Sequence, residues 1–248
     1  FQERWPYDEV DIARFLRKGK NVIAALVHSY GCTTNQYIPL DAAGLIIRGK
    51  AGKADISTGP EWRVRYSPGH KRHMTRLSRE LGFEEIFDAR ADNGEWHKVS
   101  YDDSEWRKPH LTAAGAMPWH FVEERGMPPL DEHVIAPRAV VASANGKCAA
   151  GWREAENLTA NYLREKRRWK PSAAGLRRPK SGATFTIGAA GGDGFAAMLI
   201  DFGQEVVGSV GIEVSGALGG EVIDWQAAET LSDLTPDVAT PLAGCNVA

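Results

Sequence analysis

The chain has 248 residues, and its 30 lysines and arginines against 32 aspartates and glutamates give a formal net charge of -2. Hydrophobic residues make up 43% and charged residues 25% of the chain, which is typical of a folded globular protein and excludes general disorder. No apolar run reaches the roughly 18 residues of a membrane span, and the balanced charge argues against a dedicated nucleic-acid binder.

The first half of the chain predicts one short helix followed by short strands. Residues 8–19 have acidic residues first, basic residues last and a glycine at the end, which favours a helix. Residues 21–28 form a short apolar run between glycines and predict a buried strand. In residues 61–66 apolar and charged residues alternate, so Trp62, Val64 and Tyr66 are expected on one face of a half-buried strand. Further strands are expected at residues 45–47 and 138–142.

Residues 152–180 differ from their surroundings in charge. Ala155, Leu158 and Tyr162 have helical spacing and are followed by a crowd of basic residues, which predicts an inserted helix or linker with a solvated face. A groove for nucleic acid is the alternative interpretation of the same segment. The basic residues are Arg164, Lys166, Arg167, Arg168, Lys170, Arg177, Arg178 and Lys180.

Beyond the basic segment the alternating pattern of strands returns, at residues 184–187, 198–202, 209–215 and 221–225. Turns containing glycine separate these runs and leave no room for crossover helices. The sequence therefore predicts a mainly β protein, with a meander or half of a sandwich in this part.

Isolated chemical motifs in the chain have ordinary structural explanations. The glycine cluster at residues 188–194 leads into a predicted strand and not into the helix that a phosphate loop needs. His70 and His73 have metal-ligand spacing, but Lys71 and Arg72 between them repel a cation. The cysteines, at positions 32, 148 and 245, are too far apart for a redox pair or metal knuckle.

Adjacent carboxylates and dispersed tryptophans complete the candidates for chemistry. Neighbouring acids on a strand point to opposite faces, so the pairs at 84–85, 102–103 and 123–124 do not form the couple that glycoside hydrolysis needs. Tryptophans stack on the faces of sugars, yet packing in a core is the commoner role of any one of them. The eight tryptophans include Trp62, Trp96, Trp106, Trp119, Trp152, Trp169 and Trp225.

Several short motifs occur together in a fixed order. The sequence LRKGKN at 16–21 precedes an apolar run, EIFDAR occupies 85–90 and DDSEW occupies 102–106. DFGQEVVG follows at 201–208, and AETL at 228–231. In this order and at these separations the motifs resemble the bacterial α-L-rhamnosidases, in the stretch that precedes their catalytic domain.

The resemblance implies a fold and a domain organisation. It implies two antiparallel β-sandwich domains of galactose-binding-like, jelly-roll type. The first occupies residues 1–137 and is expected to be clipped at its start. Residues 138–180 are a linker with the basic helical insert, and residues 181–248 begin a second, incomplete sandwich.

The resemblance also implies a function. Its members are glycoside hydrolases that remove terminal α-L-rhamnose with inversion, using acidic residues on a helical catalytic domain that is missing from this chain. We therefore expect no catalytic residue, no metal and no cofactor here, and we expect the chain alone to be inactive. The expected partners are a rhamnose-containing glycan or glycoside and the helical catalytic domain, with no nucleic acid and no membrane. A bacterial source is implied, with the oligomeric state and the choice between cytoplasm and secretion open.

Four residues within the motifs are candidates for contact with substrate: Glu85, Asp88, Arg90 and Trp106. In one interpretation the three charged residues form a partly buried ion-pair network that holds a loop. In the other the loop shapes the sugar pocket. An autonomous carbohydrate-binding module without hydrolase activity is the alternative function. Gly203 and Gly208 are interpreted as residues needed for backbone conformation.

Overall fold

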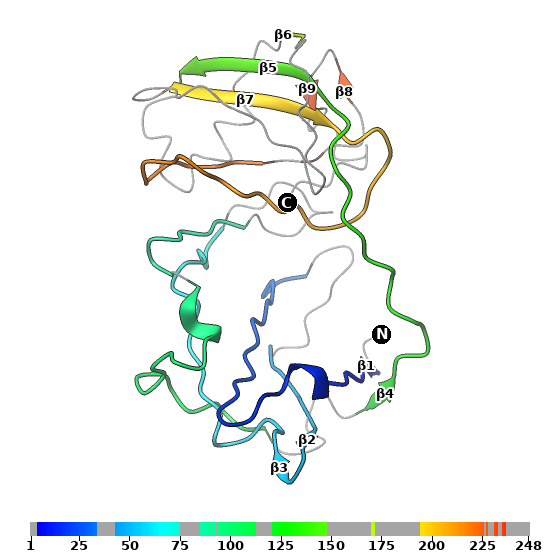
Figure 1. The fold of residues 1–248 in the computed structure, drawn as a ribbon, viewed down its shortest axis with the longest axis vertical. Coiled ribbons are helices and arrows are strands. Elements are labelled where there is room, and N and C mark those ends of the chain that lie inside the picture. The colour runs from blue at the N-terminus through cyan, green and yellow to red at the C-terminus, as the bar shows by residue number, and fades with distance from the viewer. Residues whose placement is uncertain are drawn as a thin grey trace. The chain divides into compact units, whose positions relative to one another are not determined.

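The computed structural model is β-rich (Figure 1). It describes residues 4–33, 43–74, 85–92, 94–112, 121–147, 170–171, 194–225, 227, 231–232 and 235–236. The chain divides into a first unit, residues 1–73 with 85–129, and a second unit, residues 74–84 with 130–248. Among the described residues, strands outnumber the two 3-10 turns and form no barrel, which confirms the mainly β class. None of the described helices has the length and apolarity needed to span a bilayer.

Two small sheets organise the first unit. Strand β1 (Trp5–Tyr7) pairs in parallel with β4 (Val122–Glu124), so the start of this unit lies beside its end. Strand β2 (Lys50–Ala51) pairs antiparallel with β3 (Ala54–Asp55). Gly52 begins the two-residue loop of this hairpin with φ +62°, a conformation that glycine adopts without strain.

The β2–β3 hairpin extends further through single backbone hydrogen bonds. Ile56 N–H donates to the Gly49 carbonyl at 3.1 Å, and Thr58 N–H donates to the Ile47 carbonyl at 3.0 Å. The strand predicted at residues 45–47 therefore contributes its last residue to this arm without forming a full strand.

The helix predicted at residues 8–19 is wrong except for one turn, the 3-10 helix η1 (Ala13–Phe15). Leu16 is already extended, with ψ 142°. Asn21 folds its side chain back: its Oδ1 accepts from Arg17 N–H at 2.9 Å, and its Nδ2 donates to the Arg17 carbonyl at 2.8 Å. Such local side-chain bonds satisfy backbone groups that a longer helix would have used.

The strands predicted at residues 21–28 and 61–66 are wrong, because neither segment has a partner strand among the described residues. Residues 21–28 form no ladder with any described residue, and Val22 and Leu26 are exposed. In residues 61–66 only Val64 forms a bridge, with Arg107. Tyr66 is 71% exposed beneath the Arg72 guanidinium, 4.0 Å from its ring centre, and is not part of a buried face.

The second unit contains the long ladder of the molecule. Strand β5 (Ala139–Lys147) lies between β6 (Lys170–Pro171) and β7 (Gly194–Asp201), antiparallel to both, and a bulge interrupts its register between Val140 and Ala142. Strands β8 (Leu231–Ser232) and β9 (Thr235–Pro236) form a separate short pair.

The second unit confirms some of the predicted strands and not others. Strands at 138–142 and 198–202 are confirmed in essence by β5 and β7, whereas residues 209–215 and 221–225 form no strand. Most of the basic segment 152–180, including the predicted helix, and the run 184–187 lie outside the described residues. The packing of sheets into sandwiches stays a prediction.

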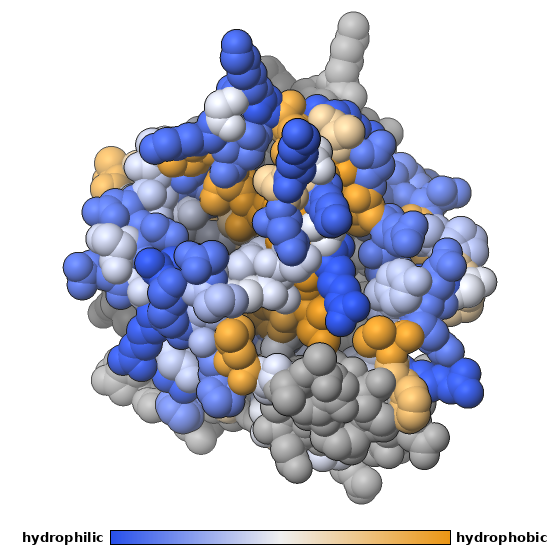
Figure 2. Space-filling view, turned by 90° about the horizontal axis from the view of Figure 1, so that it is seen from below, coloured by the Kyte–Doolittle hydropathy of each residue, from blue (hydrophilic) through white to orange (hydrophobic). Residues whose placement is uncertain are grey.

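Burial among the described residues is confined to few side chains. Ala142 is the buried hydrophobic residue and Asp92 the buried charged one. Figure 2 shows a face on which hydrophobic side chains lie in separate places between hydrophilic ones. Gly203 has φ +74° and confirms its conformational role, whereas Gly208 has no positive φ and open space around it, so its predicted role is wrong.

Candidate functional site

The EIFDAR motif is positioned by pairing with residues 69–71. Asp88 N–H donates to the Gly69 carbonyl at 2.8 Å, and Lys71 N–H donates to the Ile86 carbonyl at 3.0 Å. Between them His70 and Phe87 form a bridge, with ring centres 4.8 Å apart. A Cβ on Gly69 would overlap the Phe87 ring, so glycine permits this close approach.

The charged residues of the motif form two separate ion pairs. Glu85 contacts His70 Nε2 at 3.3 Å, while His70 Nδ1 lies 2.7 Å from Ser67 Oγ. Arg90 forms a two-point contact with Asp88 at 2.8 and 2.7 Å and is otherwise mostly exposed. The hydrogen bonds from Arg90 lower the pKa of Asp88 to about 2. The sequence offered a single, partly buried ion-pair network of Glu85, Asp88 and Arg90. The structure instead contains two separate ion pairs.

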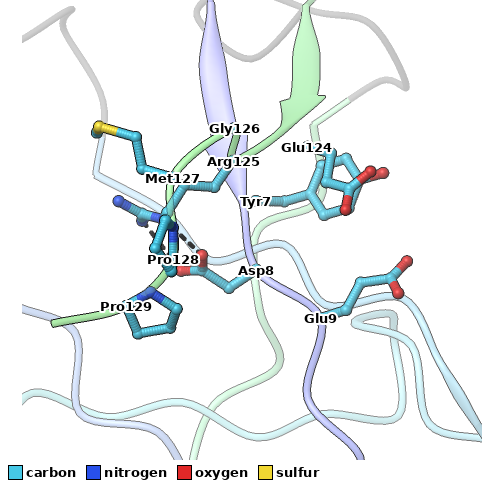
Figure 3. Close-up of a pocket in the computed structure, with 9 residues that line it drawn as sticks. All are labelled: Tyr7, Asp8, Glu9, Glu124, Arg125, Gly126, Met127, Pro128 and Pro129. Atoms are coloured by element: carbon cyan, nitrogen blue, oxygen red, sulfur yellow. Dashed lines mark hydrogen bonds and ion pairs between the residues drawn. The ribbon is translucent and has the colours of Figure 1, made fainter. Parts of the chain in front are cut away.

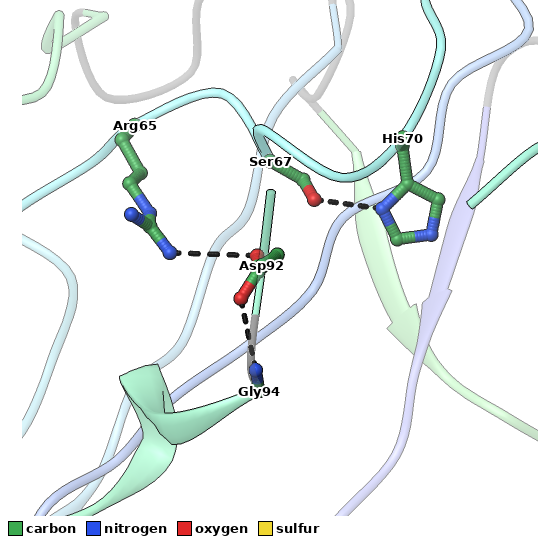
Figure 4. Close-up of polar contacts among 5 residues, drawn as sticks. All are labelled: Arg65, Ser67, His70, Asp92 and Gly94. Atoms are coloured by element: carbon green, nitrogen blue, oxygen red, sulfur yellow. Dashed lines mark hydrogen bonds and ion pairs between the residues drawn. The ribbon is translucent and has the colours of Figure 1, made fainter. Parts of the chain in front are cut away.

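The buried charged residue of this region is one that sequence reasoning missed, Asp92. Its side chain is 4% exposed, and its Oδ2 lies 3.4 Å from Arg65 Nη2. Its other oxygen accepts the Gly94 N–H at 3.0 Å (Figure 4). A DNG sequence at 92–94 is a turn former that indicates such a side-chain contact.

Arg65 connects Asp92 to the DDSEW motif. Its guanidinium lies 4.7 Å from the Trp106 ring centre and 5.6 Å from the Tyr101 ring centre. The two rings meet edge to face at 5.9 Å. Asp102 Oδ1 accepts the Ser104 N–H at 3.0 Å, and the Asp103 carbonyl accepts the Trp106 N–H at 2.9 Å, so the motif is a turn that presents Trp106 to Arg65. Trp106 is thereby brought to Asp92, and not to Glu85 or Arg90.

A small cavity of about 230 Å³ lies next to this cluster. Trp96 belongs to η2 (Glu95–His97), the 3-10 helix that begins directly after Gly94. Tyr101 follows through a second turn, in which its N–H donates to the Lys98 carbonyl at 3.0 Å. Asp92 is thus linked to both aromatic residues of the cavity, to the 3-10 helix of Trp96 through Gly94 and to Tyr101 through Arg65. The cavity is lined by Lys20, Asn21, Val22, Trp96, Lys98, Val99, Tyr101 and Asp103.

A larger, more open cavity of about 570 Å³ lies where β1 and β4 end (Figure 3). Arg125 holds Asp8 in a two-point ion pair, and its hydrogen bonds lower the pKa of that carboxyl. The remaining lining mixes one aromatic ring, two carboxylates and an apolar turn. It comprises Tyr7, Glu9, Glu124, Gly126, Met127, Pro128 and Pro129.

Nothing in the described part of the chain forms a metal centre. Within those residues, no three histidine, cysteine, aspartate or glutamate side chains are grouped so that they could hold an ion. Cys32 is a free, half-buried thiol, and the other two cysteines lie outside the described residues.

Comparison with known proteins decides the family. The family model described as "Alpha-L-rhamnosidase N-terminal domain" matches residues 1–133, more than half of the 248 residues. The chain belongs to the bacterial α-L-rhamnosidase family, in the region of its N-terminal domain. The match contains both cavities and all four residues predicted to contact substrate.

One curated relative extends the similarity beyond the N-terminal domain. An α-L-rhamnosidase of Streptomyces avermitilis is 26% identical over 234 residues, which cover 88% of this chain. The same alignment covers 17% of the relative, so this chain corresponds to a small part of that protein. No solved structure matches the chain.

Proposed function

We propose that this chain is the non-catalytic N-terminal portion of an enzyme that removes terminal α-L-rhamnose from glycosides. The observation that carries the proposal is the match of residues 1–133 to the N-terminal domain family. The chain covers a small share of the Streptomyces avermitilis relative. This supports the proposal that the hydrolytic carboxylates belong to a helical catalytic domain outside these residues.

The geometry supports an accessory role close to the sugar. Inverting hydrolysis needs two carboxyl groups about 6.5–9.5 Å apart across one sugar ring, one acting as acid and one as base. The carboxylates of the EIFDAR motif are instead occupied by His70 and Arg90, so they hold local structure. The aromatic cavity beside Asp92 offers contact surface for a sugar without that pair. We place both units in β-sandwiches of galactose-binding-like type, as the resemblance implies.

The test measures release of L-rhamnose from an aryl α-L-rhamnoside by two proteins. One is the 248-residue chain, and the other is the product of the complete reading frame that contains it. We expect release by the complete product and none by the chain. Release by the chain would overturn the non-catalytic role, and no release by the complete product would overturn the relation to rhamnose hydrolysis.

An autonomous carbohydrate-binding module is the second candidate, favoured by the aromatic cavity. It predicts sugar binding by the chain together with no hydrolysis by the complete product.

A further inference from the structure

We propose that Ser67, His70 and Glu85 form a nucleophilic site that hydrolyses small acyl esters. The inference goes beyond the proposed function, because it concerns an ester bond and not a glycosidic bond. It rests on two contacts of one imidazole ring. Ser67 Oγ lies 2.7 Å from His70 Nδ1 (Figure 4), and the Glu85 carboxylate lies 3.3 Å from His70 Nε2. A nucleophile within hydrogen-bond reach of a base, with the base held by a third group, is the arrangement that activates serine in hydrolases.

The contact with Glu85 determines which nitrogen of His70 acts as the base. A carboxylate accepts hydrogen bonds, so it holds the imidazole proton on Nε2. Nδ1 is then left with the lone pair that accepts the Ser67 hydroxyl proton. The familiar serine–histidine–aspartate triad uses the two nitrogens in the opposite order, but either nitrogen can accept a proton while the other carries one. Ser67 and His70 are therefore the reacting pair, and Glu85 is a positioning residue.

The backbone around Ser67 and the packing of His70 hold the reacting pair in place. Pro68 has a fixed φ and restricts the residue before it, Ser67, to extended backbone. The His70 ring lies against the Phe87 ring, with their centres 4.8 Å apart. Backbone hydrogen bonds on either side of His70 join it to residues 86–88. The pair is thus positioned before a substrate arrives, which lowers the entropic cost of the reaction.

The reacting pair is accessible to a small substrate. Ser67 is half-buried, and the His70 side chain is 30% exposed. His70 and Phe87 are the non-hydrogen-bonded pair of their bridge, so the His70 N–H points away from Phe87. Among the described residues this N–H has no acceptor, and it is the backbone donor that the turn offers to a developing oxyanion. Because solvent reaches the turn directly, the expected substrate carries a small acyl group such as acetyl.

Hydrolysis of the ester takes two steps. Ser67 Oγ attacks the ester carbonyl while its proton passes to His70 Nδ1. The bond to the leaving oxygen then breaks, and the departing alcohol takes that proton from His70. In the second step His70 accepts a proton from water as the water attacks the acyl-serine. The carboxylic acid is released, and the proton returns to Ser67 Oγ.

The experiment treats the full 248-residue chain with diisopropyl fluorophosphate and locates the label by peptide mass spectrometry. In this reagent reaction the Ser67 oxygen bonds to phosphorus, fluoride leaves and the hydroxyl proton passes to His70. We expect the label on Ser67. Hydrolysis of 4-nitrophenyl acetate is measured in parallel. We expect a turnover below the roughly 1–1,000 per second typical of enzymes, since one backbone N–H stabilises the oxyanion.

Four variants test the roles of the residues. S67A should abolish the label and lower ester hydrolysis at least about ten-fold, and H70Q should slow both reactions about 100-fold. E85Q should lower kcat about ten-fold and leave KM unchanged, because Glu85 acts through His70 and does not touch the ester. The matched control is S104A, whose hydroxyl contacts Asp102 and whose loss should change neither reaction. Chemical denaturation of each variant separates a loss of chemistry from a loss of folding.

The outcomes distinguish this site from the proposed function. No label on Ser67 of the folded chain, or ester hydrolysis that S67A and H70Q leave unchanged, overturns the site. A wild-type kcat in E85Q overturns the positioning role of Glu85. Release of L-rhamnose by the complete product is measured separately, so failure of the ester site leaves the proposed function standing.

Discussion

Each of the two units of the molecule is stabilised internally by a different kind of contact. In the second unit, backbone hydrogen bonds join β5 and β7 along almost their whole length. In the first unit, short strands and turns are fixed by side chains such as Asp92, Asn21 and Arg125. Ion pairs such as Arg65 with Asp92 and Arg125 with Asp8 belong to the first unit.

This difference indicates that the stability of the two units depends on different groups. The backbone hydrogen bonds of a strand ladder can form with many different side chains, so the stability of the ladder depends little on single polar side chains. A site built from turns depends on specific residues, and it presents side chains of several types to one cavity. Substitutions in the two units should therefore fail in different ways.

The largest effect is expected at the buried centre of β5. Ala142→Asp places a carboxylate where no water reaches, which we expect to lower the free energy of unfolding by about 3–5 kcal/mol. Amides of β5 and β7 should lose protection from hydrogen exchange. The exposed Ala136 is the control, because Ala136→Asp should change stability by less than about 0.5 kcal/mol. Unchanged protection in A142D would contradict the view that this ladder forms the rigid part.

The next effect concerns close packing in the first unit. In Gly69→Ala the new methyl group overlaps the Phe87 ring and lies 3.0 Å from Asp92 Cβ, so we expect a loss of about 1–3 kcal/mol in chemical denaturation. Gly126→Ala is the matched control, since nothing lies within 4 Å of its added methyl group. Equal stability of the two variants would show that the pairing of residues 69–71 with 86–88 tolerates expansion.

A smaller effect separates the two contacts of Asp92. Asp92→Ala removes both, and we expect a loss of about 1–2 kcal/mol because the partly exposed Arg65 is left unpaired. Asp92→Asn retains an acceptor for Gly94 and weakens only the contact with Arg65. In tryptophan fluorescence and denaturation, D92N should fall between the wild-type protein and D92A. A D92N variant as unstable as D92A would assign the whole effect to the charge pair.

The smallest effect is a pH dependence at Asp88. Its pKa of about 2 lies below the ordinary value of 3.8, so the ionised form stabilises the fold above about pH 4, and this contribution is lost as the pH falls toward 2. The stability difference between the wild-type protein and D88N should shrink over that range. R90Q should show the same loss of pH dependence, because Arg90 is the main cause of the lowered pKa. A constant difference down to pH 2 would contradict this assignment.

The sequence predicted the mainly β class, the strands β5 and β7 and the conformational role of Gly203, since these follow from local pattern and composition. It failed for residues 8–19, where the side chain of Asn21 competes with the helix. It also failed for residues 21–28, since strand propensity does not supply a partner strand.

In the site, Trp106 was predicted as a contact residue, and the structure places it against Arg65 and Tyr101 and not among the residues that line the cavity. Trp96 was one of several tryptophans that sequence reasoning could not distinguish. What separates it is the pair of turns after Gly94 and the proximity of residues 20–22, which are more than 70 positions away in the chain.

By itself the sequence determined the class of fold and the family, because alternation, glycines and short motifs are local properties of the chain. Which charges are buried, which rings share a cavity and how Asp92 is linked to those rings became clear only from the three-dimensional structure. Burial and long-range contacts depend on where distant segments meet, and no local pattern around Asp92 or Arg65 contains that information.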